Sequence, residues 1–544
     1  MKKILLFLAI INFSSIISYA QVQNWLWAKS SDDSISNSSL ASSVAVDASG
    51  NAFVAGYFVA PSITFGSTTL ISAGSENIFL AKYDAVGNVL WAKSAGGIKN
   101  DCATSVAVDA SGNIYVAGIF QSPTITFGST ILMNLGVFNI YLAKYDTIGN
   151  VLWAKSAGGT GLKEVSSIAL DASGNIYVTG EFRNAPITFD SITLTNVGYN
   201  DMFLAKYDAV GNVLWAKSAG GTGSDGACSV SVDASGNAFV AGYFQDPSIT
   251  FGSTTLTSAG SLDIFLAKYD AVGNVLWAKS AGDTSADMAY SVAIDVSGNI
   301  YVSGAFESPT ITFGSTILKN AGFSNTFLAK YDATGNELWA KSADSSSIDG
   351  IIRSITIDAF GYIYAIGYFK SPTITLGPFT LTNAGSQNIF LAKYDALGNV
   401  LWAKCAGGTS SDDAGSVTAD ASGAIYISGY FGSHSINFGS TILTNKGAID
   451  NDNMFLAKLS STVGINKFNN TLISIYPNPA INNITIETPQ QATIKVLNIQ
   501  GQLMKTLSTS ANKTNIDVSA LPNGFYVVET KTEKGVVVRK FVKQ

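Results

Sequence analysis

A sevenfold internal repeat constrains the fold of this 544-residue sequence more than any other feature. Three short sequences recur about every 62 residues: Trp-Ala-Lys, Asp-Ala-Ser-Gly and Phe-Leu-Ala-Lys, the last two with close variants. The repeated tryptophans are Trp27, Trp91, Trp153, Trp215, Trp277, Trp339 and Trp402. A period of this length indicates similar units that bury their hydrophobic faces against one another.

One unit, residues 105–156, predicts four strands. They are Ser105–Val108, Ile114–Phe120, Asn139–Tyr145 and Val151–Ser156. Val, Ile, Tyr, Phe and Trp dominate these stretches, as is typical of strands. The second strand is almost wholly apolar, so we expect it inside a sheet that is covered on both faces.

The first and second strands, and the third and fourth, are joined by similar turns. Asp109–Asn113 and Asp146–Asn150 both follow the pattern Asp-x-x-Gly-Asn. Asp accepts backbone N–H bonds across such a turn, and Gly supplies the positive φ of a type I turn followed by a bulge. Calcium ligation would be an alternative role for the aspartates, but the turn also explains the Gly and the Asn, so we favour the turn.

The strand count predicts a closed ring. The fourth strand is missing after Phe455–Lys458, whereas an extra copy, Asn24–Lys29, stands near the N-terminus. If the N-terminal strand completes the last sheet, both irregularities are explained. An open solenoid would leave that strand unpaired. We therefore predict an all-β, seven-bladed β-propeller over residues 21–462, closed by its N-terminal strand.

The two ends of the sequence differ from the repeat. Lys2 and Lys3, the apolar run Ile4–Ile11 and the small residues of Ser18–Ala20 predict a signal peptide at 1–20. Residues 463–472 form a mostly polar linker, and 473–544 contain alternating strands punctuated by Pro and Gly, which favours a small β-sandwich. No later stretch is long enough to span a bilayer after signal cleavage.

Two resemblances to known families follow from these motifs. Val108–Gly118, Val-Asp-Ala-Ser-Gly-Asn-Ile-Tyr-Val-Ala-Gly, resembles the bacterial β-propeller repeat known as SBBP, a family with no single agreed function. The C-terminal segment resembles the type A sorting domain of the type IX secretion system. The residues that carry this second resemblance are Tyr476, Pro477, Asn478, Pro479, Gly501, Pro522 and Gly524.

The second resemblance has implications for localisation. It implies that the type IX secretion machinery exports the chain across the outer membrane of a Gram-negative bacterium. In that family the domain is then usually cleaved, and the cargo is either released or linked to surface lipopolysaccharide.

An acidic residue recurs between each fourth strand and the next first strand. Asp101, Asp225, Asp287, Asp349 and Asp412 each lie ten residues after their Trp, and Glu164 lies eleven after its own. In a propeller these residues would ring one face, together with the long segment between the second and third strands and opposite the tight hairpins. Two interpretations are open: a ligand-binding face that includes Ca²⁺, which prefers oxygen ligands, or polar turns without a ligand.

Other candidates for chemistry are sparse. His434 is the sole histidine, so no zinc cluster is expected, and a role as a surface loop residue is favoured over that of a general base. No nucleophile elbow, zinc-protease or phosphate-loop motif occurs. We expect no structural disulfide among Cys102, Cys228 and Cys405. The Ile-Thr-Phe-Gly-Ser segments should extend the blades as short strands, with core phenylalanines at Phe65, Phe127, Phe189, Phe251 and Phe313.

These observations favour a binding or adhesion scaffold without a cofactor, secreted or held on the cell surface. The formal net charge of −6 and the absence of a basic run argue against nucleic acid as a partner. A glycan or a protein is the expected ligand, and a monomer the expected state. The alternatives are a polysaccharide-acting hydrolase or lyase, and a structural coat component. The near-identity of the acids across repeats argues against a single catalytic centre.

Overall fold

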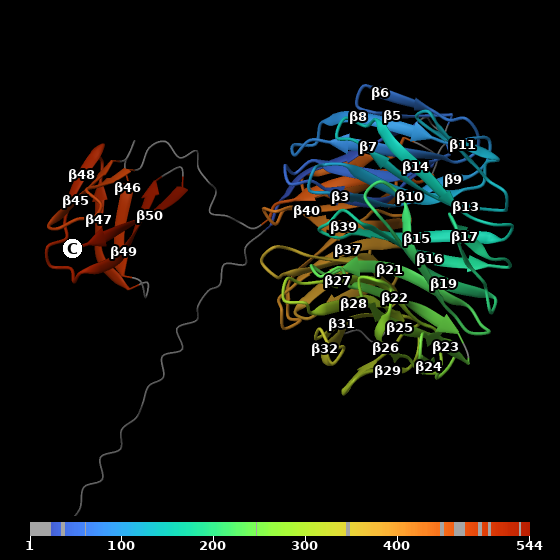
Figure 1. Cartoon of the computed structure of the whole chain (residues 1–544). Helices are drawn as coiled ribbons and strands as arrows, with labels where there is room; N and C mark the ends of the chain where they lie inside the picture. Colours follow the sequence, from blue (N-terminus) through green and yellow to red (C-terminus); the bar gives the residue numbers. More distant parts are fainter. Residues whose placement is uncertain are drawn as a thin grey trace, which may run out of the picture. The chain divides into compact units, whose positions relative to one another are not determined.

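The computed structural model describes residues 23–33, 38–59, 61–245, 247–343, 349–446, 451–461, 474–487, 492–498, 502–532 and 535–544. The described residues contain no helix, and hence none that is long and apolar enough to cross a membrane. The chain divides into two compact units, one of residues 24–461 and one that contains the C-terminal strands (Figure 1). The predicted signal peptide (1–20) and the predicted linker (463–472) lie outside the described residues.

The described residues of the larger unit form seven four-stranded antiparallel sheets. Sheet 1 is β3 (Ser39–Val46), β4 (Ala52–Phe58), β7 (Asn77–Tyr83) and β8 (Val89–Ala95). Sheet 2 is β9 (Asp101–Val108), β10 (Ile114–Phe120), β13 (Asn139–Tyr145) and β14 (Val151–Ala157). Sheet 3 is β15 (Leu162–Leu170), β16 (Ile176–Arg183), β19 (Asn200–Tyr207) and β20 (Val213–Ala219). Sheet 4 is β21 (Asp225–Val232), β22 (Ala238–Gln245), β25 (Leu262–Tyr269) and β26 (Val275–Ala281).

The remaining three sheets follow the same pattern. Sheet 5 is β27 (Asp287–Ile294), β28 (Ile300–Phe306), β31 (Asn325–Tyr331) and β32 (Glu337–Ser342). Sheet 6 is β33 (Gly350–Ile357), β34 (Ile363–Phe369), β37 (Asn388–Tyr394) and β38 (Val400–Ala406). Sheet 7 is β39 (Asp412–Ala419), β40 (Ile425–Phe431), β43 (Asn453–Leu459) and the N-terminal β1 (Trp25–Ser30).

The second and third strands of the unit used for prediction, Ile114–Phe120 and Asn139–Tyr145, have the bounds expected from the sequence. The first strand begins at Asp101 instead of Ser105, because Asp101–Ala103 continue the pairing with β10 beyond a bulge. The same register shift occurs in the first strand of every sheet. One residue of each first strand is therefore bulged out of the ladder.

The Ile-Thr-Phe-Gly-Ser segments correct one expectation. They do not extend the four-stranded sheets but form hairpins of their own, and in the first of these β2 (Asp32–Asp33) adds a third strand. The hairpins are β5 (Ser62–Phe65) with β6 (Thr68–Ile71), β11 (Thr124–Phe127) with β12 (Thr130–Met133), β17 (Ile187–Phe189) with β18 (Ile192–Leu194), β23 (Ser248–Phe251) with β24 (Thr254–Thr257), β29 (Thr310–Phe313) with β30 (Thr316–Lys319), β35 (Thr373–Leu376) with β36 (Phe379–Thr382), and β41 (Ser435–Phe438) with β42 (Thr441–Thr444). The five phenylalanines predicted to be in the core, Phe65, Phe127, Phe189, Phe251 and Phe313, are buried.

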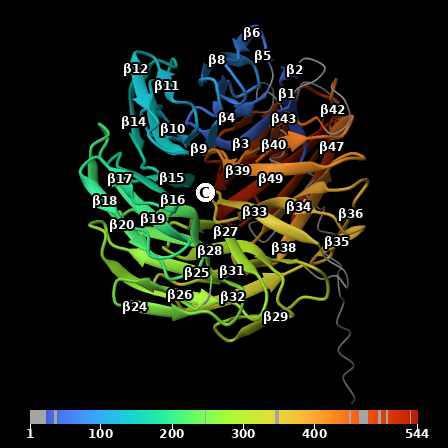
Figure 2. The same ribbon diagram turned by 90° about the vertical axis from the view of Figure 1, so that its right-hand side faces the viewer.

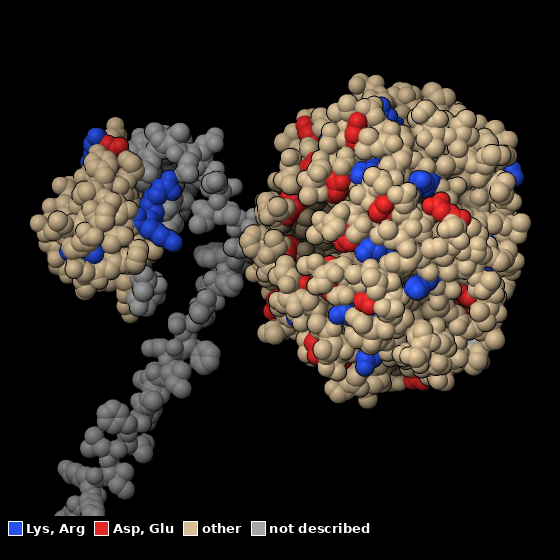
Figure 3. Space-filling model, viewed as in Figure 1, with Lys and Arg blue, Asp and Glu red and all other residues tan. Residues whose placement is uncertain are grey.

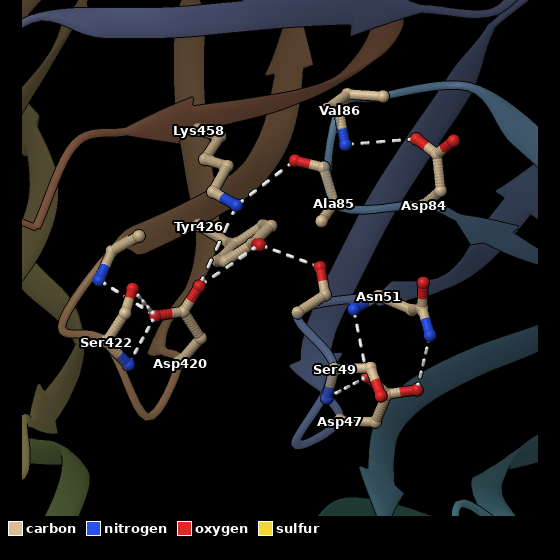
Figure 4. Close-up of polar contacts among 12 residues, drawn as sticks. Asp47, Ser49, Asn51, Asp84, Ala85, Val86, Asp420, Ser422, Tyr426 and Lys458 are labelled. Carbon is tan, nitrogen blue, oxygen red and sulfur yellow. Dashed lines mark hydrogen bonds and ion pairs between the residues drawn. The ribbon is translucent and has the colours of Figure 1, made fainter. Parts of the chain in front are cut away.

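The tight turns have the predicted hydrogen bonds. In the first turn of sheet 1, Oδ1 of Asp47 accepts the N–H groups of Ser49 and Asn51, and Oδ2 accepts the Asn51 side chain (Figure 4). Gly50 has a φ of 77°, a conformation that glycine adopts without steric cost. The turn residues thus satisfy their own polar groups, which supports the turn interpretation of these aspartates.

Neighbouring sheets pack face to face and are joined by repeated polar contacts. Phe53 and Leu80 of sheet 1, for example, share one core with Val116 and Phe120 of sheet 2. The third-strand lysine of a sheet donates to a turn carbonyl of the next, as Lys82 Nζ does to Thr147 at 3.0 Å. The first strands contact one another in succession and lie toward the middle of the unit, where Figure 2 labels β3, β9, β15, β27, β33 and β39. The arrangement is propeller-like.

The N-terminal strand pairs with β43 in sheet 7, as the sequence predicted. Ala28 lies opposite Ala457, and Lys29 opposite Leu456. Sheet 7 also makes the repeated contacts with sheet 1, because Lys458 Nζ donates to the Ala85 carbonyl at 3.1 Å and Tyr426 Oη to the Gly50 carbonyl at 2.7 Å (Figure 4). Each sheet within the described ranges is itself open.

The C-terminal unit contains two further sheets. One is formed by β44 (Ser474–Tyr476), β45 (Asn483–Glu487) and β48 (Lys513–Asp517), and the other by β47 (Leu503–Thr509), β46 (Ala492–Asn498), β49 (Gly524–Thr532) and β50 (Gly535–Lys543). Ile484 and Ile486 from the first sheet share a core with Ile494, Val496 and Val528 from the second. Two sheets around one apolar core agree with the predicted sandwich.

Candidate functional site

The predicted acidic ring is mostly buried and hydrogen-bonded to the backbone. Asp101, Asp225, Asp287 and Asp412 each have an exposed fraction of 0 %. Oδ1 of Asp101 accepts the N–H groups of Gln121 and Ser122, both at 3.1 Å, and Oδ2 accepts Gly97 N–H and Ser122 Oγ–H, both at 2.7 Å. Through these hydrogen bonds, each aspartate connects the end of the second strand of its sheet to the segment that leads into the first strand of the same sheet.

The other acids singled out from the sequence do not occupy this position. The residue opposite Phe182 of sheet 3 is Lys163, not Glu164, and the residue opposite Phe369 of sheet 6 is Gly350, not Asp349. Lys163 is fully buried and donates to the Ala185 carbonyl at 3.2 Å, and burial lowers its pKa to about 8. Asp349 is half-buried and lies one residue outside the register.

The hydrogen bonds of the buried aspartates disfavour calcium binding by their carboxylate groups. The four buried aspartates already use both carboxylate oxygens as acceptors for backbone or serine donors. Within the ranges that the structure describes, no group of three or more His, Cys, Asp or Glu is placed to hold a metal. The position expected to face a ligand thus serves to fix the loops at one end of each sheet.

Because of these buried aspartates, we expect the repeat unit to be more stable at mildly acidic pH than at neutral pH. Burial raises the pKa of Asp225 to about 7, and raises that of Asp287 to about 6. A carboxyl group with a raised folded-state pKa binds more protons when folded, so the free energy of unfolding should rise as pH falls from about 7 to about 4. Thermal unfolding at constant ionic strength, from pH 8 to pH 5, should show a rising midpoint. A smaller rise is expected for Asp225→Asn, and a midpoint that falls over this range would contradict the assignment.

Variation between the repeats is concentrated beside these aspartates. Three positions on the inner strands hold a different combination of residues in each sheet, although the third of them is tyrosine in four of the seven sheets. The first position follows that of Asp101 and its equivalents, and it holds Leu40, Cys102, Glu164, Gly226, Met288, Ile351 and Asp413. The second is the bulged residue of the first strand: Ser42, Thr104, Ser166, Cys228, Tyr290, Arg353 and Gly415. The third lies opposite the first position on the second strand: Tyr57, Ile119, Glu181, Tyr243, Ala305, Tyr368 and Tyr430. We call these the inner variable positions. They were not recognised from the sequence, although aligning the repeats would have shown which columns vary.

Sheets 6 and 7, together with Tyr290 of sheet 5, bring five of these residues close to one another. We call them the sheet 6–7 cluster: Tyr290, Arg353, Tyr368, Asp413 and Tyr430. Arg353 Nη2 lies 3.0 Å from Asp413 Oδ2, and Tyr430 Oη lies 3.3 Å from the same oxygen. The Arg353 guanidinium lies 5.5 Å from the centre of the Tyr368 ring. Burial raises the pKa of Asp413, while the Arg353 charge opposes that rise.

A second group of inner variable residues joins sheets 3 and 4. Glu164 lies directly opposite Glu181, and Arg183 Nη2 lies 3.9 Å from Glu164 Oε1. Tyr243 Oη donates to Glu181 Oε2 at 2.7 Å. Burial raises the pKa of Glu181, and the Glu164 charge raises it further. The inner variable positions therefore combine tyrosines, carboxylates and the guanidinium group of Arg353.

The remaining candidates are not part of these groups. His434 is exposed on a loop, and its carbonyl accepts Asn445 N–H at 2.8 Å. Cys102, Cys228 and Cys405 are free thiols, and Cys102 Sγ donates to Glu76 Oε2 at 2.9 Å. In the view of Figure 3, acidic side chains gather toward one side of the repeat unit, whereas lysine and arginine side chains are dispersed.

In the C-terminal unit, the motif Tyr476–Pro479 is held to the last strand. Asn478 Nδ2 donates to the Lys540 carbonyl at 3.2 Å, and Asn478 Oδ1 accepts Val542 N–H at 2.9 Å. Pro522 accepts a hydrogen bond from Tyr526 Oη at 2.8 Å, and Gly524 opens β49. Gly501 lies outside the described residues. The motif thus connects the start of the domain to its final strand.

Comparison with known proteins identifies this C-terminal unit. Residues 474–544 match the family of secretion system C-terminal sorting domains, the sorting domain of type IX secretion. Such a domain indicates export to the cell surface or into the medium in Bacteroidetes-type bacteria, and it implies interaction with the secretion machinery.

The repeat unit has more distant similarities. The chain is 26% identical over 507 residues to an uncharacterized WD repeat-containing protein of Acanthamoeba polyphaga mimivirus. The aligned region covers 76% of this chain and 36% of that protein. The chain is 24% identical over 302 residues to the regulatory protein FlaEY of Caulobacter vibrioides, covering 51% of this chain and 31% of that protein. The chain thus spans about a third of the length of these curated relatives.

Two solved structures are also similar. Sqt1 from Chaetomium thermophilum has a TM-score of 0.34 at 9% identity, covering 75% of this chain and 97% of that one. PorZ of Porphyromonas gingivalis, described as an essential bacterial surface component of the type IX secretion system, has a TM-score of 0.22 at 10% identity, covering 95% of this chain and 100% of that one.

Proposed function

We propose that the seven sheets form a closed seven-bladed β-propeller of SBBP-type repeats, with β1 as the strand that completes the ring. The support is that sheet 7 bonds to sheet 1 as other sheets bond to their successors. Besides the contacts of Lys458 and Tyr426, Ser39 N–H donates to the Asp452 carbonyl at 2.7 Å. A closed ring leaves no inner strand without a neighbour, which limits unwanted pairing of sheet edges.

We further propose that this ring is a binding or adhesion scaffold, exported by the type IX system and displayed on the cell surface or released as a monomer. One observation carries the proposal: a repeated framework holds inner variable positions whose combination of residues differs in every sheet. A purely structural ring would not need unlike residues at equivalent positions. Unlike polar and aromatic residues on a rigid frame suit the recognition of an asymmetric ligand.

Binding by the full-length protein to intact bacteria and to arrays of extracellular glycans and proteins tests this proposal. We expect capture that Glu181→Gln and Tyr243→Phe weaken by tenfold or more, since both change the sheet 3–4 contact. Lys93→Ala, on the outer strand β8, is the matched control and should bind normally. Equal binding by all variants would exclude the inner positions as the ligand site.

The same protein should leave polysaccharides intact. The alternative function, a hydrolase or lyase, would use a carboxylate pair such as Glu164 and Glu181. A screen for soluble products from bacterial and plant polysaccharides distinguishes the two functions. Product release that is abolished in Glu181→Gln would overturn the binding proposal in favour of catalysis.

Export should depend on the bond between Asn478 and the last strand. Asn478→Ala removes both hydrogen bonds to β50, and a net loss of about 1–2 kcal/mol is expected in the stability of the sorting domain. We expect less protein at the cell surface and in the medium, measured by immunoblotting of cell fractions. Asn515→Ala, at an exposed position of β48, is the control. Normal export of Asn478→Ala would contradict this role.

A further inference from the structure

A groove lies between sheets 4 and 5, away from the inner variable positions. Its volume is about 400 Å³, within the range of about 300–1,000 Å³ that is typical of small-molecule sites. β26, the β29–β30 turn, the end of β31 and the start of β32 line it, and Figure 2 labels β26, β29 and β32 at the edge of the repeat unit. We call this space the 4–5 groove. Besides two glycines, its lining residues are Lys279, Ser280, Ser315, Tyr331, Asn336 and Glu337.

The 4–5 groove contains polar atoms that the described residues leave without a partner. Tyr331 is 8% exposed, and its hydroxyl has no hydrogen-bond partner in the part of the chain that the structure describes. Glu337 Oε1 accepts from Thr316 Oγ1 at 2.7 Å, whereas Oε2 has no donor among the same residues. A buried hydroxyl without a partner costs free energy, so a ligand that supplies hydrogen bonds here would be stabilising.

Lys279 adds a positive charge from the neighbouring sheet. Its Cε lies 3.3 Å from the position that a Cβ of residue 335 would occupy, so the lysine stem lies against the turn before β32. Its ammonium group has no ion pair or hydrogen bond with Glu337 or with any other described residue. The groove therefore presents an unpaired ammonium group and an unpaired carboxylate oxygen together.

The equivalent groove between sheets 1 and 2 lacks the carboxylate. It has a volume of about 340 Å³ and is lined by Lys93 and Tyr145, but Val151 occupies the position of Glu337. Val151 and Glu337 correspond because each pairs with the tyrosine that ends the third strand. Valine also holds this position in sheets 1, 3, 4 and 6. Glu337 thus distinguishes the 4–5 groove from its equivalents.

The charges and the polar lining of the 4–5 groove narrow the ligand class. A ligand with a single charge would be attracted by one of Lys279 and Glu337 and repelled by the other. Apart from the Tyr331 ring and the Lys279 stem, the lining carries no apolar side chain, and its polar groups come from separate segments of the chain. Polar groups on several sides of a groove match a molecule with hydroxyl groups around its whole outline.

We propose that the 4–5 groove binds a neutral saccharide unit. Sugar hydroxyl groups donate to Glu337 Oε2, accept from the Lys279 ammonium group and exchange a hydrogen bond with the Tyr331 hydroxyl. Such bonds to charged groups are among the stronger hydrogen bonds in proteins. The site is additional to the inner variable positions and does not depend on what they bind.

The test uses the full-length protein on an array that carries neutral, uronic-acid-containing and amino-sugar-containing oligosaccharides. We expect capture of neutral oligosaccharides, reduced tenfold or more by Glu337→Val and by Lys279→Ala, and reduced less by Tyr331→Phe. Glu337→Val installs the residue that the equivalent grooves have, so the fold should tolerate it. Lys341→Ala is the matched control and should bind normally, because this equivalent lysine lies beside Gly398 in the groove that has Val400. Circular dichroism checks that each variant is folded.

The outcomes separate this inference from the proposed function. Capture confined to acidic or amino-sugar oligosaccharides, or no capture of any saccharide, overturns the ligand class. If Glu181→Gln weakens capture of neutral oligosaccharides while Glu337→Val does not, the inner variable positions bind them, and the groove proposal fails while the proposed function stands. Equal losses for Lys341→Ala and Lys279→Ala would also exclude the 4–5 groove as the site.

Discussion

Replacing Trp27 by alanine is expected to destabilise the repeat unit by about 3–5 kcal/mol, the range found for large aromatic residues removed from cores. Trp27 is 9% exposed, its ring lies 6.0 Å from that of Tyr426, and Nε1 donates to the Ala85 carbonyl at 3.2 Å. It therefore packs where β1 joins sheet 7 and where sheet 7 meets sheet 1. Urea unfolding followed by circular dichroism measures the loss.

The adjacent residue provides a matched control for Trp27. Leu26 is skipped by the pairing between β1 and β43, and it is 54% exposed. Leu26→Ser should therefore change the free energy of unfolding by less than about 0.5 kcal/mol, as is usual for exposed positions. If Leu26→Ser and Trp27→Ala have equally small effects, β1 does not contribute to the core as described.

The second large effect is expected for Asp101→Ala, at about 2–4 kcal/mol. The substitution leaves the N–H groups of Gly97, Gln121 and Ser122 without their acceptor, and each such group costs free energy if it stays buried. Chemical denaturation again measures the change. A result below about 1 kcal/mol would mean that water replaces the carboxylate at little cost.

Asp349→Ala is the control that separates the sequence pattern from the structure. Asp349 also lies ten residues after its tryptophan, but Gly350 occupies the position that corresponds to Asp101. Because Asp349 is half-buried and outside the register, we expect a change of less than about 0.5 kcal/mol. Equal losses for Asp349→Ala and Asp101→Ala would contradict this distinction.

Much of the fold was predictable because short sequence patterns within each repeat indicate its strands and turns. The apolar run Ile114–Phe120 and the Asp109–Asn113 turn were predicted with the bounds that the structure has. The pairing of the N-terminal strand was also predictable, because the sequence has one extra copy of the fourth strand near the N-terminus and lacks one in the last repeat. Asp101–Ala103 were missed as strand residues because a polar residue followed by small ones has little strand character on its own.

The site was less predictable than the fold. An aspartate in a polar connection looks exposed in the sequence, and burial of Asp101 becomes visible only once the loop of Gln121 and Ser122 folds over it. The search for an acidic residue also selected Glu164, eleven residues after Trp153, although Lys163, ten residues after that Trp, holds the equivalent position. The pairing of Arg353 with Asp413 joins residues from different repeats, and no local pattern indicates such a contact.

The proposed closed ring depends most on the pairing of the N-terminal strand with β43, and a disulfide cross-link tests this pairing directly. Ala28 and Ala457 are antiparallel partners across the two strands. The Cα atoms of such partners lie about 4.5–5.5 Å apart, a distance that a disulfide can span. In a chain whose Cys102, Cys228 and Cys405 are replaced by serine, cysteines at 28 and 457 should form a disulfide on mild oxidation. Peptide mapping should then recover one species that joins the two positions. A cysteine at 28 that remains reduced, or that links as readily to a cysteine at position 205 in sheet 3, would contradict the closed arrangement.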